Sequence, residues 1–315
     1  MYRKSNASII TALLLFFALF LSGCAASEGS FEKAAQLYEE GKYREAEDYF
    51  EIAVEENPDD ELIHIGHGFN LAMLGRADLA IKDLAPIYES RILNGLKTEK
   101  DIEFMFELGD ALIDLYTDTG EGEKAAYVAD QLAFFARSDK EKKEYQLKSA
   151  GVGVDIYKDD PDHISEYRIS LMNVIDLSVY AGNEYVELVN TYRTGGEYRE
   201  MLLTTDNMII YMRGRSAHID NFPAAICSIL DAAEAASYVE DYQKTPQDYY
   251  DAAQEFITLA GDKGLTYEQK LRYRIVIAER MHQKDVAIRL LGVYLNHCKD
   301  DKKAIKEKLF LENRF

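Results

Sequence analysis

The sequence has no tryptophan, only five prolines and only three cysteines among its 315 residues. Because proline interrupts helices, its scarcity in a chain rich in Ala, Leu, Glu and Lys favours helical structure throughout. The spacing of Cys24, Cys227 and Cys298 matches neither a zinc motif nor a small disulfide scaffold. If Cys24 is modified, the other two could pair. They fall in different predicted helical hairpins, however, and two free buried thiols are the favoured interpretation.

Basic residues are also scarce, with 36 Lys and Arg against 56 Asp and Glu, for a formal net charge of −20 at pH 7. A surface of this charge repels nucleic acid and anionic lipid headgroups. The charge therefore argues against a nucleic-acid partner, and solubility is its simplest explanation. The hydrophobic share, 47%, is ordinary for a protein with a buried core.

Three features follow one another in the first 24 residues. Tyr2-Arg3-Lys4 is basic, residues 9–21 are almost continuously apolar, and Leu21-Ser22-Gly23-Cys24 comes next. The apolar stretch is shorter than the roughly 20 residues that span a bilayer, and it fits the core of a secretion signal. The whole segment resembles the signal of bacterial lipoproteins. The resemblance implies removal of residues 1–23, a lipid on Cys24, and a location on the extracytoplasmic face of the cell membrane. Residues 24–30 would then be a flexible tether.

One pattern occurs twice within residues 31–92, with its copies 34 residues apart. Four residues of the first copy, Leu37, Gly41, Ala46 and Phe50, recur as Leu71, Gly75, Ala80 and Leu84. A 34-residue period with small residues at fixed offsets resembles the tetratricopeptide repeat (TPR), a pair of antiparallel helices. A third copy over 101–136 is stretched by four residues, about one helical turn. The resemblance implies an all-α fold, a right-handed superhelix of antiparallel helix pairs.

Helical periodicity continues beyond the repeats. We expect TPR-type repeats over 31–136, and degenerate repeats with a C-terminal capping helix over 137–315. The predicted helices of the second part cover 163–180, 184–194, 197–213, 223–241, 247–260, 266–282, 284–297 and 302–312. Thr245-Pro246 and Thr266 are predicted helix starts. Pro86 is expected to kink or shorten its helix, and Gly151-Val152-Gly153 favours a turn.

No residue pattern predicts an enzyme or a cofactor. His64 and His67 have a spacing that can bind zinc, but a site needs a third ligand, so packing is the favoured interpretation. The other histidines are scattered, and none lies in a nucleophile motif. The remaining candidate is a binding surface.

The TPR resemblance implies a concave wall made by the first helix of each pair. The wall residues that we expect to contact a partner are Phe31, Tyr38, Ile65, Phe69, Met73, Phe106 and Ile113. The predicted wall is apolar and lacks the Lys and Asn residues with which some TPR proteins hold a terminal carboxylate. It suits an amphipathic helix or an extended peptide, unless the chain's own C-terminal helices fill it.

These observations predict a lipid-anchored, non-enzymatic scaffold that holds another envelope protein or peptide, attached to the membrane through its N-terminal lipid. The alternative is a surface lipoprotein that binds a glycan or a small solute. Its support is the 22 tyrosines, nine of which cluster between residues 180 and 250. Tyrosine is routinely half-buried in helix packing, however, and the missing tryptophan counts against glycan binding.

Overall fold

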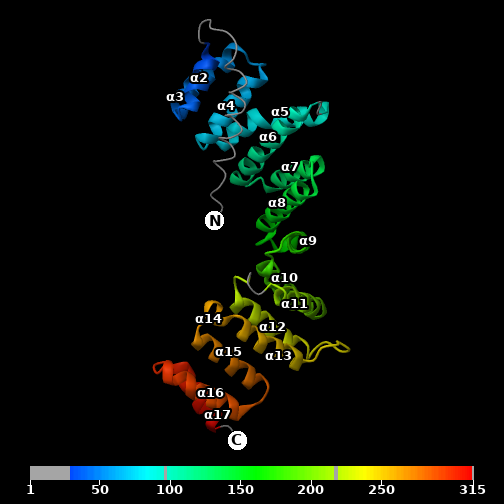
Figure 1. The fold of residues 1–315 in the computed structure, drawn as a ribbon, viewed down its shortest axis with the longest axis vertical. Coiled ribbons are helices and arrows are strands. Elements are labelled where there is room, and N and C mark those ends of the chain that lie inside the picture. The colour runs from blue at the N-terminus through cyan, green and yellow to red at the C-terminus, as the bar shows by residue number, and fades with distance from the viewer. Residues whose placement is uncertain (1–28, 96–97, 216–218, 314–315) are drawn as a thin grey trace. The chain divides into compact units, whose positions relative to one another are not determined.

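The computed structural model describes residues 29–95, 98–215 and 219–313, and every regular element in these ranges is helical (Figure 1). The α-helices are α2 (Ser30–Glu39), α3 (Tyr43–Glu56), α4 (Glu61–Met73), α5 (Ala77–Asn94), α6 (Glu99–Asp118), α7 (Gly122–Phe135), α8 (Asp139–Tyr157), α9 (Ile164–Leu177), α10 (Gly182–Thr194), α11 (Tyr198–Arg213), α12 (Phe222–Ala235), α13 (Pro246–Leu259), α14 (Gly261–Gly264), α15 (Tyr267–Arg280), α16 (Lys284–His297) and α17 (Lys302–Asn313). A 3-10 turn, Pro161–His163, precedes α9.

None of the described helices is long and apolar enough to cross a membrane. The predicted signal, with its apolar stretch over 9–21 and Cys24, lies outside the described residues.

The helices pack in consecutive pairs within two compact units. The first unit extends to Ser170 and contains the pairs α2–α3, α4–α5 and α6–α7, with α8 packed on α7. The second begins at Leu171 and contains α10–α11, α12–α13 and α15–α16, with α17 packed on α16. In both units the second helix of one pair also contacts the first helix of the next, as α3 contacts α4 and α11 contacts α12. This packing confirms the predicted all-α, TPR-like array of helix pairs.

The same turn joins the two helices of a pair at five places. Its central residue has a positive φ, between 57° and 76°, and is Gly41, Gly75, Gly120, Gly196 or His282. At the first turn the N–H of Gly41 donates to the carbonyl of Tyr38, and the N–H of Lys42 donates to that of Leu37. These two bonds satisfy the last carbonyls of a helix, and glycine adopts the required left-handed conformation without strain. The turn therefore fixes where each second helix begins.

The positions that follow this turn are also repeated. The residue five places after the central one is fully buried each time: Ala46, Ala80, Ala125, Met201 and Ala287. The residue nine places after it is fully buried as well: Phe50, Leu84, Ala129, Thr205 and Leu291. The sequence predicted four of these copies. The α10–α11 copy was missed because methionine and threonine replace the expected small and apolar residues.

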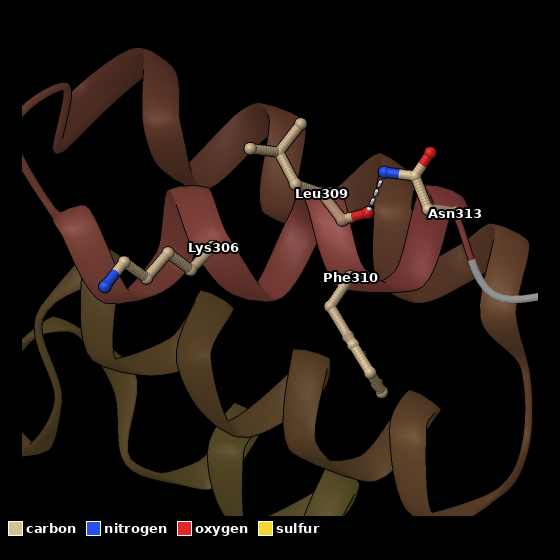
Figure 2. A pocket seen from close by; sticks show the side chains of 4 residues that line it. All are labelled: Lys306, Leu309, Phe310 and Asn313. Carbon is tan, nitrogen blue, oxygen red and sulfur yellow. Dashed lines mark hydrogen bonds between the residues drawn. The ribbon is translucent and has the colours of Figure 1, made fainter.

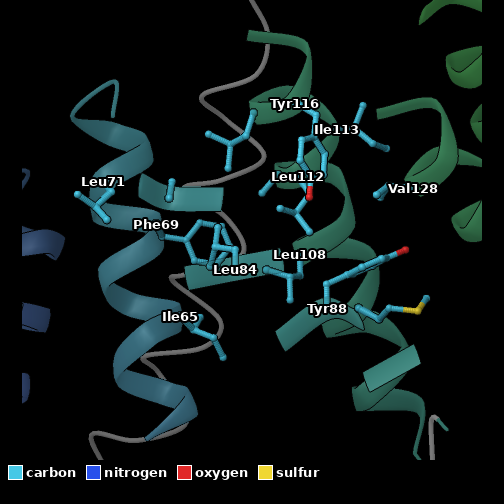
Figure 3. Close-up of a cluster of buried hydrophobic side chains, with 14 of the residues drawn as sticks. Ile65, Phe69, Leu71, Leu84, Tyr88, Leu108, Leu112, Ile113, Tyr116 and Val128 are labelled. Atoms are coloured by element: carbon cyan, nitrogen blue, oxygen red, sulfur yellow. The ribbon is translucent and has the colours of Figure 1, made fainter. Parts of the chain in front are cut away.

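The core of the first unit forms where successive helices approach closely (Figure 3). Phe69, Leu84 and Leu108 belong to one buried cluster that runs from α2 to α8. Gly68 allows α4 to approach α5, because a Cβ at this position would lie only 2.7 Å from Leu84 Cγ. The second unit has a larger cluster over α10–α13 and α15 and a smaller one over α15–α17.

Several local predictions are confirmed and others are wrong. Thr245 and Thr266 form capping boxes at the starts of α13 and α15, as expected. Pro86 does not shorten its helix, because α5 continues for 18 residues through it, and a kink at Pro86 stays a prediction. Gly151 and Gly153 lie inside α8 rather than in a turn. Gly153 allows α8 to approach α9 closely, because a Cβ at this position would lie 2.4 Å from the hydroxyl oxygen of Ser170.

Candidate binding groove

The residues of the predicted concave wall lie mostly in the protein interior. Five of them are 6% exposed or less: Tyr38, Ile65, Phe69, Phe106 and Ile113. Phe31 and Met73 are partly buried and pack against the same cluster. These five side chains are therefore not open to solvent in the described structure, and their contact with a partner stays a prediction. The covering side chains come from the helices of the same unit, such as Leu84 and Leu108 around Phe69 (Figure 3).

A polar network takes up both histidines of α4. His64 Nδ1 lies 3.0 Å from Asp83 Oδ1 of α5, and His64 Nε2 lies 2.9 Å from the carbonyl of Pro58. His67 lies 2.7 Å from Asp83 Oδ2 and 3.6 Å from Glu47 Oε1 of α3. Glu47 is 6% exposed and accepts a hydrogen bond of 2.7 Å from the fully buried Asn70. The network joins α3, α4 and α5 by charge as well as by packing.

The electrostatics of the network favour protonated histidine. Burial lowers the pKa of His67. The hydrogen bond and charge of Asp83, together with the charge of Glu47, raise this pKa by more than burial lowers it, so it lies above its usual value. The pKa of His64 is raised too: burial opposes the shift, whereas the Pro58 carbonyl and Asp83 cause it. Within the described ranges no three His, Cys, Asp or Glu side chains are arranged to hold a metal ion. The geometry therefore supports the packing interpretation of these histidines.

Two of the clustered tyrosines bind a partly buried aspartate. In the second unit, Asp206 of α11 accepts hydrogen bonds from the hydroxyls of Tyr242 at 3.0 Å and Tyr249 at 2.9 Å, and pairs with Lys244 at 2.8 Å. Burial, then the hydrogen bond and charge of Asp206, raise the pKa of Tyr242 to about 12. Tyr249 is fully buried. These two tyrosines therefore hold the α12–α13 hairpin against α11 and are not offered to a ligand.

The first unit repeats this arrangement. Asp110 of α6 accepts a hydrogen bond of 3.0 Å from the Tyr145 hydroxyl and pairs with Lys148 Nζ at 2.6 Å, both from α8. In each unit a Tyr and a Lys from a later segment share one aspartate on an earlier helix. Such satisfied buried polar groups fix the position of a helix more strictly than apolar contacts do.

A groove of about 290 Å³ lies in the second unit between α13, α15 and α16. Its lining residues are Tyr250, Asp251 and Gln254 of α13, Arg274, Ile277, Ala278 and Met281 from α15 and its end, and Gln283, Val286 and Leu290 leading into and along α16. The lining combines apolar side chains with two opposite charges, Arg274 and Asp251. No sequence motif marks it, because its residues come from three separate helical segments spread over residues 250–290.

Arg274 has no partner for part of its guanidinium. It forms no ion pair with the residues that the structure describes, and its buried Nε has no hydrogen-bond partner there. Asp251, which also lines the groove, accepts a hydrogen bond of 2.8 Å from Gln247 of its own helix. The guanidinium of Arg274 is therefore a charged donor in the wall of the groove that the described residues leave without an ion pair.

A second depression, of about 440 Å³, lies along α17 (Figure 2). It is lined by Lys306, Leu309, Phe310 and Asn313, and Asn313 Nδ2 donates to the carbonyl of Leu309 at 2.7 Å. Leu309 and Phe310 are 52% and 59% exposed. All the lining residues lie on one helix, so this surface lacks the convergence of elements that distinguishes the groove between α13, α15 and α16.

Both cysteines of the described chain are free. Cys227 is exposed and Cys298 is partly exposed. The prediction of free thiols agrees with the structure, whereas the prediction that both are buried is wrong.

Neither a protein-family model nor a curated protein matches the sequence. Solved structures do. The C-terminal part of a TPR repeat-containing protein from Cytophaga hutchinsonii is 17% identical, covers 88% of this chain and 98% of its own, and has a TM-score of 0.44. A tetratricopeptide repeat protein from Parabacteroides merdae is 16% identical, covers 90% and 96%, and has a TM-score of 0.36. A chain of the Naa15/Naa10 complex bound to HypK-THB is 12% identical, covers 91% and 39%, and scores 0.49. Because these TM-scores are below 0.5, the fold class rests on the helix pairs and turns described above.

Proposed function

We propose that this protein is a non-enzymatic scaffold that binds another protein through the groove between α13, α15 and α16. The observation that carries the proposal is the groove itself, which is lined by apolar side chains from three helices and by an arginine that forms no ion pair with the described residues. Pockets of this composition, mostly apolar with a few placed polar groups, are typical binding sites. The net charge of −20 favours partners whose overall charge is positive.

We further propose that a lipid on Cys24 holds the scaffold at the extracytoplasmic face of the bacterial cell membrane. The support is the order of basic residues, apolar stretch and Leu-Ser-Gly-Cys sequence at the N-terminus. The test is metabolic labelling of cells with an alkyne analogue of palmitate. Labelling of the wild type and of Cys298→Ser, but not of Cys24→Ser, is expected. Equal labelling of Cys24→Ser would refute the anchor.

Partner binding is tested by photocrosslinking in living cells from the full-length chain. A photoreactive residue replaces Met281, which lines the groove, or Arg289, an exposed residue of α16 outside it. We expect one dominant envelope protein to be captured from position 281 and not from position 289. Capture that is equal at the two positions, or absent from both, would contradict the proposed site.

Phe69 is not a suitable position for this test, although the predicted wall includes it. It is 2% exposed, so Phe69→Glu would bury an unpaired charge and would unfold the first unit. Loss of binding in that variant would report loss of structure.

A further inference from the structure

Arg274 has no acceptor among the described residues, and this indicates which chemical group a partner would place beside it. Arg274 lies at one end of a stripe along α15, with Ile277 and Ala278 one turn away and Met281 two turns away, and all four line the groove. A stripe of this length extends about 10 Å, the span of roughly three residues of an extended chain. An anion at one end and apolar groups beyond it would match the stripe.

The polar side chains of α13 and α16 indicate what part of a bound partner lies next to the anion. Gln254 of α13 and Gln283, at the start of α16, line the groove, and neither side-chain amide forms a hydrogen bond with the described residues. Side-chain amides can both donate to and accept from the backbone of an extended segment. Asp251 can accept from a backbone N–H of the same segment.

We propose that the groove binds an extended segment of the partner in which an acidic side chain is followed by apolar residues, with the carboxylate on Arg274. Arginine suits this role because the two terminal nitrogens of its guanidinium form a fork that matches the two oxygens of a carboxylate. Because Gln254 and Gln283 also line the groove and can bind the backbone of a continuing chain, we assign the carboxylate to a side chain and not to a chain terminus. This inference rests on the proposed function and specifies its ligand.

The test measures binding of three short fluorescent peptides to the purified full-length protein by fluorescence polarisation. The first is blocked at both ends and has a central glutamate with leucine on either side. The second has glutamine in place of glutamate. The third is a dileucine peptide with a free carboxyl terminus. We expect the glutamate peptide to bind at least tenfold more tightly than the other two.

The variants are Arg274→Gln and the matched control Arg289→Gln, which removes the same charge from an exposed site outside the groove. Arg274→Gln should lose the tenfold preference for glutamate, and Arg289→Gln should keep it. Equal binding of the glutamate and glutamine peptides to the wild type would overturn the inference, as would tighter binding of the free-terminus peptide. An unchanged preference in Arg274→Gln would also overturn it.

A second measurement covers the case in which Arg274→Gln fails to fold. In Arg274→Lys the charge stays but the planar fork is lost, so a reduced preference for glutamate is expected. In the wild type, one arginine Nε–Hε NMR signal should shift on addition of the glutamate peptide, and no shift of any such signal would contradict the inference. If crosslinking from position 281 succeeds while these peptides show no preference, the proposed function stands and only the acidic segment is wrong.

Discussion

Replacement of Gly68 by alanine tests the close approach of helices on which the repeat depends. Gly68 is in the interior of α4, where alanine is the better helix former by about 1 kcal/mol. The added Cβ, however, would lie 2.7 Å from both Cγ and Cδ2 of Leu84 and 3.2 Å from Cβ of Asp83. Leu84 is fully buried and Cγ is not the free end of its side chain, so the clash cannot be relieved by a rotation into open space.

The two effects have opposite signs, and their sizes decide the outcome. Overpacking a well-packed core costs about 1–3 kcal/mol, and two contacts below 3.0 Å place this case at the upper end of the range. With about 1 kcal/mol of helix propensity subtracted, we expect Gly68→Ala to lower the free energy of unfolding by about 2 kcal/mol. Gly151→Ala is the matched control. It is also inside a helix of the first unit, but its Cβ would meet nothing within 4 Å, so stabilisation by about 1 kcal/mol is expected.

The assay is urea unfolding followed by circular dichroism, with hydrogen exchange of α4 and α5 to localise the change. A double-mutant cycle with Leu84→Ala separates the clash from other causes, because removal of the Leu84 side chain should make Gly68→Ala neutral or stabilising. If Gly68→Ala is as stable as Gly151→Ala, or if its penalty persists in the Leu84→Ala background, α4 and α5 do not approach as described.

Three further perturbations concern the polar clusters. The pKa of His67 is raised on folding, so protonated His67 stabilises the protein fully below the unfolded pKa of about 6.5. This stabilisation is lost as the pH rises through the pKa of the folded state. Between pH 6 and 8.5 the urea midpoint of the wild type should therefore fall more than that of His67→Gln. Asp206→Asn should cost about 2 kcal/mol by urea unfolding, because the loss of charge weakens three bonds at once. Burial, then the charge and hydrogen bond of Glu307, raise the pKa of Glu279 to about 7, so the ionised carboxylate opposes folding above that pH. After allowance for its partial exposure, Glu279→Gln should raise the free energy of unfolding at pH 8 by about 1 kcal/mol. At pH 4 the same substitution should leave the free energy of unfolding nearly unchanged. An equal effect at both pH values would contradict the last assignment.

The helices were largely predictable because their limits are set by local chemistry. The predicted helix over 284–297 matches α16 residue for residue, and the one over 247–260 differs from α13 by one residue at each end. A threonine cap followed by proline, or a glycine at a left-handed position, determines such ends without reference to distant residues. Where the ending signal was weak, the prediction failed: the helix over 223–241 in fact ends at Ala235.

The α10–α11 copy shows the limit of a pattern based on residue type. Gly196 makes the same turn as Gly41, but Met201 occupies the position of Ala46, and Thr205 that of Phe50. Thr205 is tolerated because its hydroxyl donates to the carbonyl of Met201 at 2.8 Å. A flexible methionine and a threonine bonded to its own helix fill the space differently from alanine and phenylalanine, and no periodicity reveals that compensation.

The binding surface was the least predictable feature because burial and binding compete for the same side chains. An apolar residue on the inner face of a helix pair can either pack against the next pair or remain open to a partner, and both outcomes give the same sequence pattern. In the first unit, Phe69 and Ile113 are buried by packing within the unit. The groove of the second unit differs in that one of its lining side chains, Arg274, is charged and forms no ion pair with the described residues. Apolar surface can be buried by the chain itself with no residual cost, whereas an unsatisfied buried donor keeps its cost until an acceptor arrives. In an array of helix pairs, a charged side chain that lines a groove and has no ion pair is therefore a better indicator of a binding site than the apolar side chains around it.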